Sequence, residues 1–90
     1  LLALAADPTV RARTLSTVNM LEAGAGTVRS LAGYAQDASP EVRAAVYEKL
    51  GSARAERPLA LRALEDAAAR ETDEAARELA AASLRRLGAR

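Results

Sequence analysis

Three short blocks of similar sequence recur along this 90-residue chain, at intervals of 32 and 34 residues. Each block begins with a side chain that can cap a helix, has a small or branched apolar residue three positions later, and then an arginine. A period in this range is typical of arrays of two-helix units, in which each unit covers the apolar face of its neighbour. The blocks are Asp7-Pro8-Thr9-Val10-Arg11, Ser39-Pro40-Glu41-Val42-Arg43 and Asp73-Glu74-Ala75-Ala76-Arg77.

Apolar residues continue each block at helical spacing, four and eight positions further on, so one helix face recurs three times. Another helix is expected before the second block and before the third. Caps, prolines and glycines divide the chain into expected helices at 8–22, 27–37, 40–51, 58–70 and 74–87, with 1–6 as the end of an earlier helix. No stretch alternates with period two, so no strand is predicted. The three faces are Val10, Thr14 and Val18; Val42, Val46 and Leu50; and Ala76, Ala80 and Leu84.

The composition excludes several classes of function. The chain has no cysteine and no histidine, so it cannot form a disulfide, a thiolate nucleophile, an imidazole-based triad or a zinc site with these ligands. Of its 45 hydrophobic residues 24 are alanine, so little bulky apolar surface is present to raise the pKa of a carboxyl group such as Glu65 or Asp66. We therefore expect no catalytic residue, no metal site and no cofactor.

Two glycine-containing stretches receive structural interpretations. Residues 24–27, Gly-Ala-Gly-Thr, lack the lysine and the preceding strand of a phosphate-binding loop. We interpret them as a turn in which Thr27 caps the next helix. Gly33 lies inside an expected helix, where it costs about 1 kcal/mol relative to alanine, and we interpret it as a point of close helix packing.

The second block resembles the second half of a HEAT repeat, and is closest to the short bacterial HEAT-like type. The other two copies are degenerate, since the first has Ala5 where the family has its turn aspartate and the third has Glu71 there. The resemblance implies an all-α fold, a short right-handed α-solenoid of about two and a half helix pairs. Its units would be a partial repeat over 1–22, a second over 23–54 and a third over 55–90. The residues that match the family pattern are Asp37, Pro40, Val42, Arg43, Leu50 and Gly51.

The resemblance also implies roles for individual residues. In HEAT-like repeats the turn aspartate and the arginine of the Val-Arg pair stabilise the stacking of adjacent repeats. On this basis Asp37, Arg11, Arg43 and Arg77 are expected to be structural, with Glu71 imitating Asp37. Most members bind proteins along a concave face built from second helices, a minority bind nucleic acid, and a few act on bilin chromophores.

Helical geometry then predicts which side chains of the second helices point away from the core. Leu15 and Tyr47 would stand one repeat apart on that face, where an aromatic is a common interface anchor. The alternative for Tyr47 is packing against an adjacent helix or a missing repeat. The predicted partner-binding residues are Leu15, Asn19, Tyr47, Glu48 and Arg85.

The expected function is a non-catalytic scaffold that binds a protein or a peptide, or further repeats of the same chain. The alternative is a nucleic-acid-binding module, which needs Arg11, Arg13, Arg43 and Lys49 on one face. A net charge of +1 argues against that alternative. The longest apolar run, 1–6, is far shorter than the about 20 residues of a membrane span, so no membrane is expected and the predicted compartment is the cytoplasm.

Overall fold

The computed structural model describes residues 7–16 and 24–88, and all of the regular secondary structure in these ranges is helical. The expected helix at 1–6 and the second half of the expected helix at 8–22 lie outside the described residues. The expected helix at 27–37 is shifted, because α2 begins two residues earlier and ends at Gly33, where a 3₁₀ turn follows. The elements are α1 (Pro8–Ser16), α2 (Ala25–Gly33), η1 (Tyr34–Gln36), α3 (Pro40–Leu50), η2 (Arg54–Glu56), α4 (Arg57–Arg70) and α5 (Glu74–Gly88).

The side chains that open the three blocks cap backbone N–H groups, as their positions predict. The Ser39 hydroxyl accepts from the Val42 N–H at 3.4 Å, and an Asp73 carboxylate oxygen accepts from the Ala76 N–H at 2.9 Å. Asp7 accepts from the N–H of Thr9 at 2.8 Å. The predicted cap at Thr27 is wrong: α2 begins at Ala25, so Thr27 lies inside the helix.

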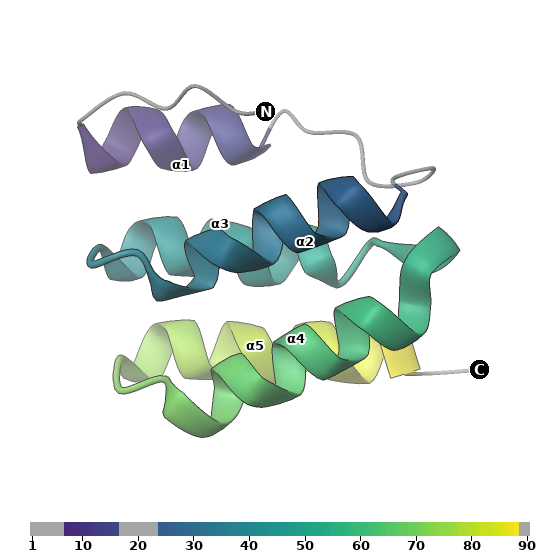
Figure 1. Cartoon of the computed structure of the whole chain (residues 1–90). Coiled ribbons are helices and arrows are strands. Elements are labelled where there is room, and N and C mark those ends of the chain that lie inside the picture. Colours follow the sequence, from purple (N-terminus) through teal and green to yellow (C-terminus); the bar gives the residue numbers. More distant parts are fainter. Residues whose placement is uncertain (1–6, 17–23, 89–90) are drawn as a thin grey trace.

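The five α-helices of the described residues form two layers (Figure 1). Helices α1, α3 and α5 lie side by side in that order, and α3 contacts both of the others. Helices α2 and α4 contact each other and lie over α3 and α5. The helices of the first layer run in one direction and those of the second run in the opposite direction, so the starts of α1, α3 and α5 are all at the same end.

The core follows the predicted stripes on two of the three helices. Every stripe position of α3 is buried, and α5 buries Ala76 and Ala80. On α1 the prediction is wrong, because Ala12 and Leu15 are buried while Val10 is 39% exposed. Helix α1 contacts α3 on one side, and among the described residues no helix covers the side that carries Val10.

Gly51 and Gly33 differ in how closely other atoms approach them. A Cβ added to Gly51 would lie 2.6 Å from a guanidinium nitrogen of Arg86 and 2.9 Å from the Ser83 Cβ, so the end of α3 approaches α5 closely. A Cβ added to Gly33 would meet no atom within 4 Å. The interpretation of Gly33 as a close-packing residue is therefore wrong, since its Cα faces open space. None of the described helices is long and apolar enough to cross a membrane.

Candidate functional site

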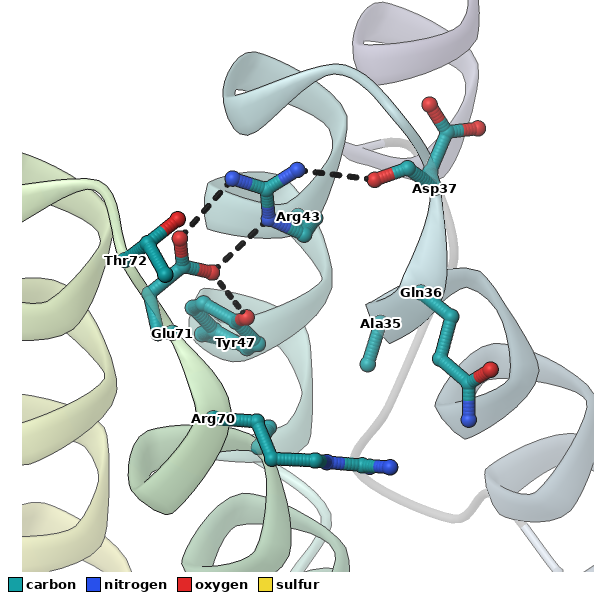
Figure 2. Close-up of a pocket in the computed structure, with 9 residues that line it drawn as sticks. Ala35, Gln36, Asp37, Arg43, Tyr47, Arg70, Glu71 and Thr72 are labelled. Atoms are coloured by element: carbon teal, nitrogen blue, oxygen red, sulfur yellow. Dashed lines mark hydrogen bonds and ion pairs between the residues drawn. The ribbon is translucent and has the colours of Figure 1, made fainter.

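Arg43 and Glu71 form a two-pronged ion pair at the end of the molecule where α3 and α5 begin (Figure 2). The Arg43 Nε donates to Glu71 Oε1 and Nη2 donates to Oε2, each at 2.8 Å. Arg43 is in the first turn of α3, and Glu71 is the residue directly after α4. The pair therefore connects one helix pair to the turn of the next.

The Glu71 side chain is 1% exposed, and its carboxylate accepts four hydrogen bonds. Besides the two from Arg43, the Tyr47 hydroxyl and the N–H of Asp73 donate to it. The hydrogen bonds from Arg43, together with those from Tyr47 and Asp73, outweigh the effect of burial and lower the pKa of Glu71 from 4.5 to about 2. Burial and the same carboxylate raise the pKa of the Tyr47 phenol above its ordinary value of 10. Glu71 is therefore ionised and Tyr47 is neutral at neutral pH.

Arg43 also binds the turn that precedes its own helix. Its third nitrogen, Nη1, donates to the carbonyl oxygens of Asp37 and Ala38 at 2.9 and 3.2 Å. The hydrogen bond to Glu71 raises the pKa of Arg43 further above its already high ordinary value. One guanidinium thus bridges two successive turns.

Arg11 and Asp37 make the equivalent contact between α1 and the turn before α3. The Arg11 Nε and Nη2 donate to the two carboxylate oxygens at 3.1 and 3.0 Å, and Asp37 also accepts from the Ser39 N–H at 2.9 Å. Although burial alone would raise it, the hydrogen bonds from Ser39 and Arg11 hold the pKa of Asp37 below its ordinary value. The predicted pairing of block arginines with turn carboxylates is confirmed at Asp37 and at Glu71.

Arg77 occupies the third equivalent position, but it makes a different contact. Its Nε and Nη2 donate to the backbone carbonyl of Glu71 at 3.2 and 3.1 Å. Among the described residues it therefore closes the turn before its own helix, as Arg43 does through Nη1, and bridges to no further carboxylate. The role predicted for Arg77 in stacking is not seen in this part of the chain.

Some of the predicted partner-binding residues are buried and others are exposed. Leu15 is fully buried and Tyr47 is 1% exposed, so their prediction as partner anchors is wrong, and Tyr47 follows the alternative of packing against adjacent helices. The prediction treated α3 as a helix with one covered side, but α3 has α1 and α5 on either side and α2 and α4 above it. Glu48 and Arg85 are exposed, and Asn19 lies outside the described residues.

Two of the four charged residues needed for the nucleic-acid alternative already form ion pairs within the chain. Arg11 and Arg43 direct their guanidinium groups at carboxylates, and their side chains are only 18% and 16% exposed. A phosphate would have to displace these ion pairs. The face that this alternative requires is therefore not formed by these two residues.

A polar pocket of about 270 Å³ lies beside the Arg43–Glu71 pair. Figure 2 shows Arg43, Tyr47 and Glu71 together on one wall, Gln36 on the other, and Arg70 extending across between them. The volume is below the about 300–1,000 Å³ of typical small-molecule sites. Among the described residues, no group of three or more carboxylates could hold a metal ion.

Two further arginines contact helix ends, and no sequence pattern marks these contacts. Arg86 of α5 donates to the carbonyls of Glu48 and Gly51 at 2.9 and 3.4 Å, at the C-terminal end of α3. Arg57 donates to the carbonyl of Gly88 at 3.0 Å. Both supply positive charge where the end of a helix carries free carbonyls and partial negative charge.

Comparisons with protein-family models, with curated proteins and with solved structures found no match for this chain. The functional argument therefore depends on the chain's own residues and their geometry.

Proposed function

We propose that this chain is a short α-solenoid of HEAT-like helix pairs that acts as a non-catalytic scaffold for binding a protein or a peptide. The observation that supports it is the bridging of successive helix pairs by Arg11–Asp37 and Arg43–Glu71. Pairs that stack in this way form an extended surface rather than an enclosed cavity.

The hydrogen bonding and the pKa of the Glu71 carboxylate support a binding role rather than catalysis. The carboxylate most strongly perturbed, Glu71, is held ionised by four hydrogen bonds and has no room to accept a proton from a substrate. A general base works best with a pKa near the operating pH, whereas the pKa of Glu71 is about 2. The group that looks most like a catalytic acid or base is thus explained by its structural contacts.

The proposed binding face is the outer side of the α3 and α5 layer. Glu48 and Arg85 are exposed, and the small side chains of Ala44 and Ala82 are half-buried. Small residues flanked by charges of both signs suit a partner segment that carries matching charges around an apolar centre. Leu15 and Tyr47, which are buried, have no part in this proposal.

Selection of peptides from a displayed library against the wild-type chain tests this face. Enriched peptides are then titrated against the charge-reversed double variant Glu48→Arg/Arg85→Glu. A matched control, Arg54→Glu/Glu65→Arg, reverses two exposed charges elsewhere and also keeps the net charge at +1. We expect affinity to fall at least about tenfold in the first variant, which is about 1.4 kcal/mol, and to stay unchanged in the control. No enrichment, or equal affinity for all three proteins, contradicts the proposal.

A further inference from the structure

Three adjoining surface hollows, together termed the groove, lie along α2 and α4 on the layer opposite the proposed binding face. The hollow at the start of α4 shares Leu59 and Arg62 with the middle hollow. The middle hollow shares Ala35, Gln36 and Arg70 with the pocket beside the Arg43–Glu71 pair. The groove therefore extends from the start of α4 to the pocket beside the Arg43–Glu71 pair.

Three exposed arginines line this groove: Arg29 of α2, and Arg62 and Arg70 of α4. Within residues 7–16 and 24–88 none of the three is in an ion pair, and Arg70 donates only its Nε, to the Asp66 carbonyl. Arg11 and Arg43, by contrast, are both bound to carboxylates. The guanidinium groups of these three arginines can therefore form charge-assisted hydrogen bonds with a ligand in the groove.

The floor of the groove is made of small side chains. Ala32, Gly33 and Ala63 line its middle, with Leu59 as the larger apolar residue. A Cβ at Gly33 would have nothing within 4 Å, so a ligand backbone can approach α2 closely there. A shallow floor of this kind suits an extended chain better than a helix, whose diameter with side chains is about 10–12 Å.

The spacing of the arginines sets the spacing of the groups that they can bind. Arg62 and Arg70 are eight residues apart on one helix, which is about 12 Å along its axis at about 1.5 Å per residue. An extended peptide rises about 3.3 Å per residue, and its side chains point to the same side at every second residue. Two acidic residues four positions apart span about 13 Å and therefore match this distance.

We propose that the groove binds an extended acidic peptide segment in which two carboxylates, four residues apart, pair with Arg62 and Arg70. A nucleic-acid strand fits less well, because Glu56 and Asp66 also line the groove. A continuous row of phosphates would meet both acids, whereas two carboxylates four residues apart can each lie beside one arginine. The inference goes beyond the proposed function, since it uses the other layer of the molecule and requires neither Glu48 nor Arg85.

Fluorescence anisotropy with labelled, end-capped synthetic peptides tests the inference. The probe is a peptide of about nine residues with two aspartates four apart in a Ser/Ala/Gly background. Comparison peptides have the aspartates three apart or replaced by asparagine, and a single-stranded oligo-dT of similar length represents phosphate ligands. We expect the four-apart peptide to bind at least about tenfold more tightly than the others. Equal affinity among the peptides, no binding, or tighter binding of the oligonucleotide overturns the proposal.

Variants of the full chain locate the binding. Arg62→Gln and Arg70→Gln should each weaken the four-apart peptide about tenfold, while the matched Arg54→Gln, at an exposed arginine outside the groove, should not. Gly33→Leu fills the groove at a position where its Cβ meets no neighbour, so it should weaken binding while circular dichroism shows an intact helical fold. If Arg54→Gln weakens binding as much as Arg70→Gln does, the attraction is a general charge effect and the proposal fails.

The Glu48→Arg/Arg85→Glu variant separates this inference from the proposed function. It should bind the four-apart peptide as the wild type does, whatever its effect on peptides selected for the other face. Loss of acidic-peptide binding in this variant, with binding retained in Arg62→Gln, would contradict the groove assignment and leave the proposed face intact.

Discussion

Arg43 and Glu71 are 28 residues apart in the chain, and both N···O distances of their ion pair are 2.8 Å. The carboxylate is 1% exposed, and it is also bound by the Tyr47 hydroxyl and the Asp73 N–H. A buried charge of this kind is stable only while its partners remain, because removal of one partner leaves the other uncompensated. The ion pair therefore makes the turn after α4 dependent on α3.

Arg43→Ala is expected to lower the free energy of unfolding by about 3–5 kcal/mol, since it leaves the Glu71 carboxylate without its cation. Arg54→Ala removes an exposed side chain that makes no hydrogen bond to the described residues, and should change the free energy of unfolding by less than about 0.5 kcal/mol. Urea unfolding followed by circular dichroism measures both. Equal midpoints for the two variants would remove the structural role of Arg43.

Stability should also depend on pH through Glu71. Its pKa is about 2 in the folded chain against an ordinary value of 4.5, so the stabilisation is fully present above about pH 4.5. As the pH falls from there toward 2, the unfolded state takes up a proton that the folded state does not, and about 3 kcal/mol is lost. Glu71→Gln lacks this component, while Asp37 titrates in both proteins. The difference in unfolding free energy between wild type and variant should therefore shrink over this range. A difference that stays constant with pH would contradict the assignment.

Two glycines should respond to alanine in opposite directions. At Gly51 the new Cβ would lie 2.6 Å from Arg86 Nη2 and 2.9 Å from Ser83 Cβ, so we expect a loss of about 1–3 kcal/mol. At Gly33 the Cβ meets no atom within 4 Å, and alanine should stabilise the helix by about 0.5–1 kcal/mol. Thermal unfolding of the two variants checks this pair, and the same sign of change for both would refute the packing described at α3 and α5.

Tyr47→Ala should unfold or strongly destabilise the chain, because it removes a large aromatic ring that is 1% exposed. Loss of a buried aromatic typically costs about 3–5 kcal/mol, and here a hydrogen bond to Glu71 is lost as well. Tyr47→Phe keeps the ring and should cost about 1–2 kcal/mol. Wild-type stability in Tyr47→Ala would show that the ring is not part of the core.

The all-α class and the arginine–carboxylate contacts could be predicted from the sequence because they depend on local patterns that recur. Ser39 and Asp73 cap their helices because a cap acts within three residues. Arg43 meets Glu71 because equivalent positions of successive helix pairs lie side by side. The position of Glu71 relative to its block matches that of Asp37, which is the basis on which the resemblance implied the same role for it.

The exposure of single side chains could not be predicted in the same way. Periodicity shows which residues of a helix share a face, but not how many of its faces have neighbours. Tyr47 is buried because α3 is enclosed by other helices, while Val10 is exposed because α1 is not. The contact of Arg86 with the carbonyls at the end of α3 joins positions 35 and 38 residues apart, and no local pattern marks it.

A double-mutant cycle on Arg43 and Glu71 tests most directly whether this ion pair holds successive helix pairs together. The unfolding free energies of wild type, Arg43→Ala, Glu71→Gln and the double variant give the coupling energy between the two side chains. We predict a favourable coupling of at least about 2 kcal/mol, with the double variant less destabilised than the sum of the single variants. Additive effects, with a coupling below about 0.5 kcal/mol, would contradict the account.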